Sequence, residues 1–156
     1  LFSTTANALF AKHPLQDVEH WTLPTRRSAP AARGAVCAKF KDGRHAWWCV
    51  VAHLSLHPQD RFAQAQSLAE HIADKKHVLL MGDFNDLPHS PSLAPLRQHM
   101  SEHTEYATYP RWQPRRAIDV VWWKGIDVVD HGVHQWGNTD HCAVDVSFTV
   151  PSAKSS

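Results

Sequence analysis

One short segment constrains the fold more than any other: the apolar run His77–Gly82, followed at once by Asp-Phe-Asn-Asp at 83–86. A continuous run of large apolar residues, without polar alternation, is typical of a strand that is covered on both faces of its sheet. Such a strand needs a layer of structure on each side. We therefore expect a layered fold in which this strand ends in a cluster of polar side chains.

The neighbouring segments predict a mixed α/β domain. Apolar residues recur at helical spacing from 58 to 76, with Phe62 among them, Asp60 in the first turn and lysines in the last, so we expect an amphipathic helix against a sheet. A short helix is expected around 92–100. Three late strands are predicted at 117–123, 126–134 and 142–150.

A β-hairpin is expected between residues 35 and 54. The Asp42-Gly43 pair suits a two-residue turn, because both central positions tolerate a positive φ, and this turn would place Cys37 opposite Trp48. Adjacent residues of a strand face opposite sides of the sheet. In each of the pairs Trp47-Trp48 and Trp122-Trp123, we therefore expect one ring to lie in the core.

Composition and spacing argue against several classes of function. The six glycines do not form GxGxxG, a P-loop or GxSxG, which argues against dinucleotide, P-loop nucleotide and elbow-type serine chemistry. The three cysteines lack CxxC spacing, which favours buried thiols over a disulfide framework. A net charge of +1, from 16 Lys+Arg and 15 Asp+Glu, gives no broad surface for nucleic acid. No run approaches the about 18 apolar residues that a membrane span needs.

Polar residues interrupt or follow apolar strands at four places. They are His53 in VVAHLSL, Asp83 and Asn85 in MGDFND, Asp119 in RRAIDVV, and Asp140 with His141 in NTDHCAV. A carboxylate or imidazole destabilises a buried strand unless it is paired. Each of these residues alone is most simply a satisfied structural group, but their recurrence indicates that they converge on one pocket.

Six segments, in this order, resemble the endonuclease/exonuclease/phosphatase superfamily, the DNase I-like metal-dependent phosphoesterases. They are Asn7–Leu15, Arg33-Gly34-Ala35, His53-Leu54 followed by Arg61, Gln66 and Leu68, Gly82-Asp83-Phe84-Asn85, Thr108-Tyr109-Pro110 followed by Arg116–Asp119, and Thr139-Asp140-His141. The resemblance implies a two-sheet α/β sandwich with the active site at the sheet ends.

The resemblance also implies roles for the residues that match its motifs. Asp83 and Asn85, two residues apart in extended chain and so on one side, would activate water and donate to the phosphate. Asp140, together with Asp83, would ligate Mg²⁺ or Mn²⁺. His141 would contact the phosphate or the nucleophile, oriented by Asp119. His53 would contact the phosphate or assist the leaving group.

Two strands of the family pattern, one bearing an Asn and one bearing a metal-ligating Glu, are not found in residues 1–33, where Glu19 lies in the wrong context. The sequence is therefore expected to hold the C-terminal part of the domain, in residues 1–150, followed by a flexible tail at 151–156. We expect the full protein to be a metal-dependent phosphoesterase, and this chain by itself to have weakened metal binding and little activity. The substrates used within the superfamily include nucleic acid and phospholipid headgroups.

Other functions stay open at this point. The chain can instead be a non-catalytic module that binds phosphate or nucleic acid without the metal-ligand Glu. Two histidine pairs with i,i+4 spacing, 53 with 57 and 99 with 103, suggest a zinc site more weakly, because His53 lies on a predicted strand and HExxH is absent. Trp112 among arginines could stack on a base. A Cys142–His141 nucleophile is disfavoured, because adjacent strand residues face opposite sides.

Overall fold

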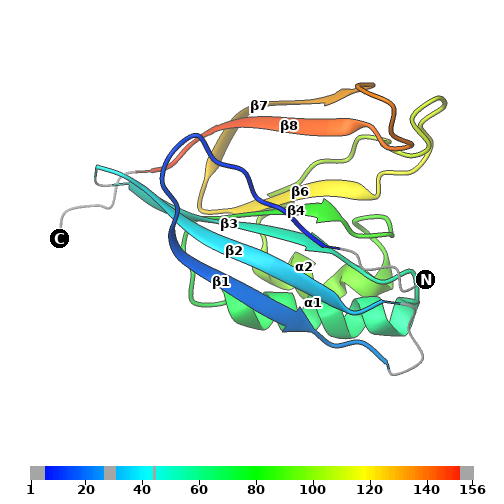
Figure 1. Ribbon diagram of the computed structural model, residues 1–156, viewed down its shortest axis with the longest axis horizontal. Helices are drawn as coiled ribbons and strands as arrows, with labels where there is room; N and C mark the ends of the chain where they lie inside the picture. Colours follow the sequence, from blue (N-terminus) through cyan, green and yellow to red (C-terminus); the bar gives the residue numbers. More distant parts are fainter. Residues whose placement is uncertain (1–5, 27–30, 44, 152–156) are drawn as a thin grey trace.

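The computed structural model describes residues 6–26, 31–43 and 45–151, which form two β-sheets and a layer of helices (Figure 1). The strands are β1 (Gln16–Leu23), β2 (Arg33–Asp42), β3 (His45–His53), β4 (Val78–Asp83), β5 (Glu102–His103), β6 (Asp119–Lys124), β7 (Asp127–His134) and β8 (Ala143–Thr149). The helices are α1 (Pro58–Ile72), the 3-10 helix η1 (Pro91–Leu93) and α2 (Ala94–His99). A six-stranded sheet has the order β1-β2-β3-β4-β6-β5, and β7 pairs with β8 in the second sheet. The helices cover one face of the first sheet, and the second sheet covers the other face. The expected two-sheet α/β sandwich is confirmed.

Strand β4 lies near the middle of the larger sheet, parallel to β3 and antiparallel to β6. Val78 and Leu80 belong to the core beneath the helices, whereas Leu79 belongs to the core between the two sheets. Alternate residues therefore enter two different cores, as predicted from the apolar run.

The buried face of α1 differs from the expected apolar stripe. Phe62 is 46% exposed, whereas Arg61 and Gln64 are buried. The side chain of Gln64 donates to the carbonyl of Pro24 and accepts from the backbone N–H of Ser55. These two backbone groups therefore have hydrogen-bond partners without water, and so does the buried amide. The helix also ends at Ile72, before the lysines expected in its last turn.

The hairpin forms, but its register is shifted by two residues from the prediction. Asp42 pairs with His45, and Cys37 pairs with Val50 rather than with Trp48. Gly43 has a φ of +56° and begins the turn one position later than expected. A shift of two residues keeps every side chain on its predicted face, because the side-chain period of a strand is two.

Both rings of each tryptophan pair pack into a core, which corrects the expectation of one ring per pair. Trp48 and Trp122 contact the core beneath the helices, and Trp47 and Trp123 contact the core between the sheets. The pairs lie on strands that are covered on both faces; Trp122 and Trp123 are buried, and Trp47 and Trp48 are half-buried.

Strand β1 is an edge strand that was not predicted from the sequence. It pairs with β2, and the register shifts between Gln16 and Glu19. Glu19 accepts a hydrogen bond from the indole N–H of Trp21 at 2.8 Å. This carboxylate therefore supports the outer edge of the sheet, two strands away from β3.

All three cysteines are buried free thiols, as predicted. Burial raises the pKa of Cys37 to about 12 and that of Cys49 to about 11, which keeps both thiols protonated and unreactive. Of the predicted tail, Pro151 is exposed and residues 152–156 lie outside the described part of the chain. Among the described helices, none has the length and apolar character required to cross a membrane.

Candidate active site

Three neighbouring strands place three of the predicted site residues in one row. His53, at the end of β3, is in register with Asp83, at the end of β4. Asp83 is in turn in register with Asp119, the first residue of β6. The parallel pairing of β3 with β4 and the antiparallel pairing of β4 with β6 thus bring the three side chains together at one end of these neighbouring strands.

His141 reaches this row from the loop before β8. Its Nδ1–H donates to Oδ2 of Asp119 at 2.8 Å. An ionised carboxylate only accepts hydrogen bonds, so this contact leaves Nε2 as the ring nitrogen that faces away from Asp119. The ring of Tyr109 lies beside the imidazole, with the ring centroids 4.8 Å apart.

Thr108 holds the two partners of this pair at their positions. Its hydroxyl oxygen accepts from the backbone N–H of Asp119 at 3.2 Å, and its carbonyl accepts from the backbone N–H of Cys142 at 2.8 Å. Arg111 fixes the same loop, because its Nε donates to the carbonyl of Thr139 at 2.7 Å. The Asp119–His141 contact is therefore built on a buried threonine rather than on mobile side chains.

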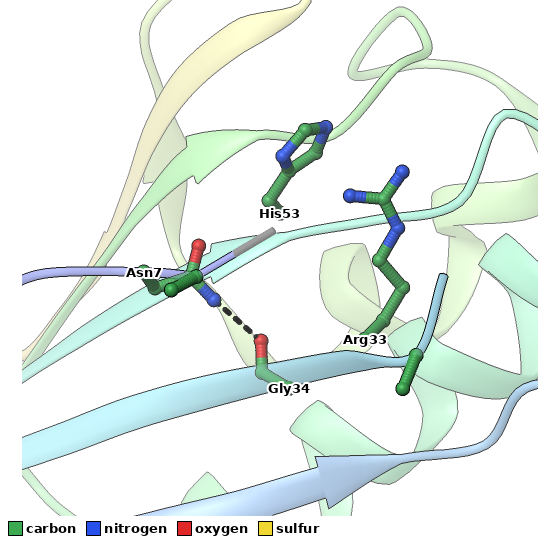
Figure 2. Close-up of a pocket in the computed structure, with 6 residues that line it drawn as sticks. Asn7, Arg33, Gly34 and His53 are labelled. Atoms are coloured by element: carbon green, nitrogen blue, oxygen red, sulfur yellow. Dashed lines mark hydrogen bonds between the residues drawn. The ribbon is translucent and has the colours of Figure 1, made fainter. Parts of the chain in front are cut away.

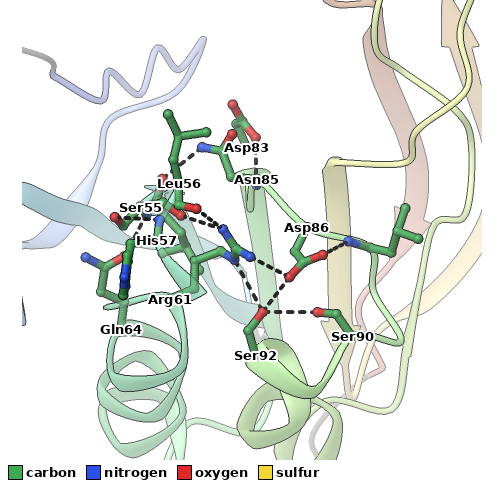
Figure 3. Close-up of polar contacts among 12 residues, drawn as sticks. Ser55, Leu56, His57, Arg61, Gln64, Asp83, Asn85, Asp86, Ser90 and Ser92 are labelled. Atoms are coloured by element: carbon green, nitrogen blue, oxygen red, sulfur yellow. Dashed lines mark hydrogen bonds and ion pairs between the residues drawn. The ribbon is translucent and has the colours of Figure 1, made fainter. Parts of the chain in front are cut away.

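Asp83 and Asn85 are brought together by a tight turn and not by extended chain, which corrects the reasoning from strand alternation. Asn85 has a φ of +54°, and its backbone N–H donates to Oδ1 of Asp83 at 2.8 Å. The side-chain amide of Asn85 donates to the carbonyl of Leu54 at 2.9 Å (Figure 3). One amide N–H is thus used within the fold, and the other is available to a ligand.

Gly82 is required for this turn to approach β3. It has a φ of +144°, and a Cβ at this position would lie 1.8 Å from the carbonyl oxygen of Ala52. Any side chain here would force β3 and β4 apart immediately before Asp83.

The environment separates the pKa values of the two imidazoles. Burial and then the positive charge of Arg33 lower the pKa of His53, against the opposing effect of Asp83. Burial also lowers the pKa of His141, but the hydrogen bond to Asp119 and the surrounding carboxylates raise it above its ordinary value. Near pH 6.5, His141 therefore holds its proton more firmly than His53 does.

Asp83 is the central carboxylate of the row. Burial raises its pKa, as does the negative charge of Asp119, while the N–H of Asn85 lowers it; the net direction is upward. Oδ2 of Asp83 lies 3.4 Å from Nε2 of His53. A carboxyl group with a raised pKa accepts a proton more readily than a surface aspartate does, which suits a general base.

The same row offers ligands to a divalent cation. One ligand atom from each of Asp83, Asp119 and His141 lies within 4.8 Å of the other two. Carboxylate oxygens are the ligands that Mg²⁺ and Mn²⁺ prefer, so this donor set fits a hard cation. Asp140 lies at the exposed side of the group, with its Oδ2 4.0 Å from Nε2 of His141 and its side chain 62% exposed.

Sequence reasoning did not assign a functional role to Arg33, which lies beside His53 in a small pocket with Asn7 and Gly34 (Figure 2). The amide of Asn7 donates to the carbonyl of Gly34 at 2.7 Å. Within the described part of the chain, the buried Nη1 of Arg33 has no hydrogen-bond acceptor. A buried guanidinium donor without a partner is costly, and here it lies beside His53, the first residue of the row. The sequence feature that could have indicated a role for Arg33 is its position at the start of strand β2.

A network around Arg61 joins the loops that follow β3 and β4 (Figure 3). The guanidinium donates to the carbonyls of Ser55 and Leu56 at 3.1 and 2.6 Å and to Oδ2 of Asp86 at 2.7 Å. Ser92 also donates to this oxygen of Asp86, at 2.8 Å. Because one loop follows His53 and the other follows Asp83, this network sets their relative position.

A family model for the endonuclease/exonuclease/phosphatase family matches residues 3–141 of the sequence. The chain belongs to this family. The match includes every predicted site residue, from His53 to His141. No curated protein matches the sequence.

Solved structures of this family share the fold. A family protein from Bacteroides thetaiotaomicron is 15% identical, with a TM-score of 0.73 over 88% of this chain and 66% of its own. A mannosyl-6-phosphatase from the same organism is 15% identical, with a TM-score of 0.71 over 87% of this chain and 67% of its own. TDP2 from D. rerio, complexed with a single-strand DNA product, is 12% identical, with a TM-score of 0.66 over 87% of this chain and 68% of its own. The chain thus spans about two thirds of the length of each. At such low identities, the likeness carries the fold alone.

Proposed function

We propose that the protein is a divalent-metal-dependent phosphoesterase that hydrolyses a phosphodiester or phosphomonoester with an activated water. The observation that carries this proposal is the row of His53, Asp83, Asp119 and His141 at the ends of the central strands. Membership of a family of phosphoester hydrolases supports it.

Each residue of the row has a role that its environment suits. Asp83, the central carboxylate of the row, accepts the proton of the attacking water. His141, oriented by Asp119, presents Nε2–H to a phosphoryl oxygen. Asn85 offers its second amide N–H to the phosphate, and His53 donates to the leaving oxygen.

Asp83 and Asp140 are the proposed ligands of Mg²⁺ or Mn²⁺, with Asp119 close enough to contribute. A cation held by these carboxylates would supply neutralisation of charge on the phosphoryl oxygens and a lower pKa for the attacking water. His141 keeps Nε2 for the phosphoryl oxygen, because its Nδ1 is bonded to Asp119.

The substrate class of the proposal is a phosphoester in general, with nucleic acid and phospholipid headgroups included. The neighbours differ in this respect, since one is a mannosyl-6-phosphatase and another is complexed with a DNA product. One fold supports many substrates, so the site and not the fold selects among them. The net charge of +1 argues mildly against strong binding to a DNA backbone.

Hydrolysis of bis-p-nitrophenyl phosphate and p-nitrophenyl phosphate tests the proposal. We expect turnover with Mg²⁺ or Mn²⁺ and its loss in EDTA, because the carboxylates need the cation to neutralise the phosphate. The 156-residue chain is assayed beside a form extended by any coding sequence upstream of it. The preference between the two substrates separates diesterase from monoesterase activity.

One outcome favours the alternative of a non-catalytic binding module. In the described residues, the cluster around His141 contains two aspartates and no glutamate. A well-folded protein that binds inorganic phosphate but turns over neither substrate, in either form, would support the binding module and contradict the phosphoesterase proposal.

Replacing Arg33 with methionine is expected to lower kcat/KM by about 10- to 100-fold, mainly through KM, because a hydrogen bond to a charged group contributes about 1.5–3 kcal/mol. The unpaired guanidinium is costly in the free protein. The variant should therefore unfold at an equal or higher urea concentration than the wild type. Steady-state kinetics and urea titration measure the two effects.

Lys41→Met is the matched control for Arg33→Met, because it removes one positive charge from the other end of β2, where the residue is exposed. It should leave KM unchanged. An unchanged KM in Arg33→Met, or a loss of stability without a change in KM, would show that Arg33 does not bind substrate.

A further inference from the structure

A second group of metal-binding side chains lies at the edge of the large sheet. It consists of His89, from the loop between β4 and η1, His103 of β5, and Glu105 just beyond β5. His103 pairs with Trp122 of β6. Trp122 is three residues along β6 from Asp119, a distance of about 10 Å in a strand, so this group is separate from the row of active-site residues.

The three side chains already contact one another. Nε2 of His89 and Oε1 of Glu105 are 2.9 Å apart, and Nδ1 of His103 is 3.9 Å from the same oxygen. One ligand atom from each residue lies within 4.8 Å of the other two. The donor atoms of a tetrahedral zinc site, with bonds of about 2.0–2.2 Å, are about 3.3 Å apart. Nδ1 of His103 also lies 3.1 Å from the carbonyl oxygen of Thr104, so ligation through this nitrogen would exchange that contact for the ion. Rotations of the exposed side chains of His89 and Glu105 would bring their donor atoms to the same ion.

The group combines one fixed ligand with two adaptable ones. The side chain of His103 is only 12% exposed, and its ring packs against Trp122 with the ring centroids 4.5 Å apart. The side chains of His89 and Glu105 are 70% and 63% exposed. A buried ring fixes the position of the site, and the exposed partners can close around an ion at little cost in strain.

We propose that His89, His103 and Glu105 form a binding site for a zinc-class transition-metal ion, with water completing its coordination. Two imidazoles and one carboxylate suit Zn²⁺, Co²⁺ and Ni²⁺, whereas Mg²⁺ prefers an all-oxygen set. The ion replaces the proton that joins His89 to Glu105.

Such an ion would connect two parts of the fold that are distant in sequence. His89 belongs to the loop that begins with the turn of Asp83 and Asn85, and His103 belongs to the edge strand. An ion that binds only the folded form stabilises it in proportion to the logarithm of its concentration above Kd. Bound Zn²⁺ should therefore raise the unfolding temperature of the protein.

Competition with a chromogenic chelator, in excess Mg²⁺, measures the number of bound Zn²⁺ ions per chain and their affinity. The visible absorption of Co²⁺ follows the binding of that ion. The Asp119→Asn/His141→Ala double variant is the background, because it removes two of the three possible ligands of the active-site row. We expect one bound Zn²⁺ in this background. His89→Ala should weaken its binding about tenfold or more, and Glu105→Gln should do the same.

His13→Ala is the control, because this exposed histidine lies in a different pocket, beside Phe40 and Trp47. It should leave Zn²⁺ affinity unchanged. If the double variant does not fold, the same substitutions in the wild type should remove one class of Zn²⁺ site and leave the Mg²⁺-dependent activity in place. Absence of Zn²⁺ binding, or an affinity unchanged by both His89→Ala and Glu105→Gln, would overturn the proposal.

Discussion

Replacing Asp119 with asparagine is expected to lower kcat by about 10²–10⁴-fold, with a much smaller change in KM. The carboxylate accepts the Nδ1–H of His141 at 2.8 Å, which leaves Nε2 free for the proposed contact with the phosphate. An asparagine of the same shape can present its NH₂ group instead, which favours the opposite tautomer of the imidazole. Steady-state hydrolysis of bis-p-nitrophenyl phosphate, in the form of the protein that turns over, measures the loss.

The same variant, Asp119→Asn, should lower the pKa of His141 in metal-free protein. Burial lowers the pKa of His141, and Asp119 is the main group that raises it above 6.5. A group with a raised pKa in the folded state stabilises the fold below its unfolded pKa, and this stabilisation is lost as pH rises through the folded pKa. The destabilisation by Asp119→Asn should therefore be larger below about pH 6.5 than in alkaline buffer. NMR of the imidazole protons and urea titrations at two pH values measure both effects.

Asp127→Asn is the matched control, because Asp127 is an exposed aspartate at the start of β7. It should change neither kcat nor the His141 titration. If Asp119→Asn kept wild-type turnover while its His141 pKa fell, the pair would be structural and another group would have to polarise the phosphate.

The layered fold could be predicted because its central strand is unusually informative. The apolar run before Gly82 has no polar alternation, and only a strand between two layers can bury both of its faces. The hairpin was also predictable, but its register was not. Gly43 can be the second residue of the turn, as predicted, or the first, as observed, and a glycine suits both positions. Both alternatives place the side chains on the same faces, so the hydrophobic pattern cannot distinguish them.

The candidate site could be predicted as a set of residues, but not as a geometry. His53, Asp83 and Asp119 were placed at strand ends, where the observed register aligns them. The turn at Asn85 was missed, since its positive φ is a local choice that alternation does not reveal. His89 was missed as a partner of His103, because residues 14 apart meet only through the tertiary fold.

The buried polar side of α1 could not be predicted either, because the partners of Arg61 lie in two loops that only the tertiary fold brings together. This side of the helix is expected to give the second large effect, on stability. Arg61→Met is expected to destabilise the fold by about 3 kcal/mol, since removing one partner of a buried ion pair leaves the other charge uncompensated. The Arg61 side chain is 8% exposed, and its partner Asp86 is 22% exposed. The carbonyls of Ser55 and Leu56 lose their donor as well.

The pH dependence of this loss follows from Asp86. Burial raises the pKa of Asp86, but the Ser92 hydroxyl, the backbone N–H of Leu87 and the Arg61 charge together hold it below its ordinary value of 3.8. A group with a lowered pKa in the folded state stabilises the fold above its unfolded pKa, and this stabilisation is lost as pH falls through the folded pKa. The difference between Arg61→Met and the wild type should therefore be constant near neutral pH and shrink below about pH 4.

Urea unfolding of three variants separates the guanidinium geometry from its charge. Arg61→Lys keeps the charge, but one ammonium group cannot reach both the carbonyls of Ser55 and Leu56 and the carboxylate of Asp86, so it should lose more than half of the stability lost by Arg61→Met. Gln66→Met is the control on the same helix, because Gln66 is exposed and its side chain donates an exposed hydrogen bond to Glu70. It should unfold within about 0.5 kcal/mol of the wild type. Wild-type stability in Arg61→Lys would mean that charge alone holds the two loops, and wild-type stability in Arg61→Met would mean that the network does not support the site.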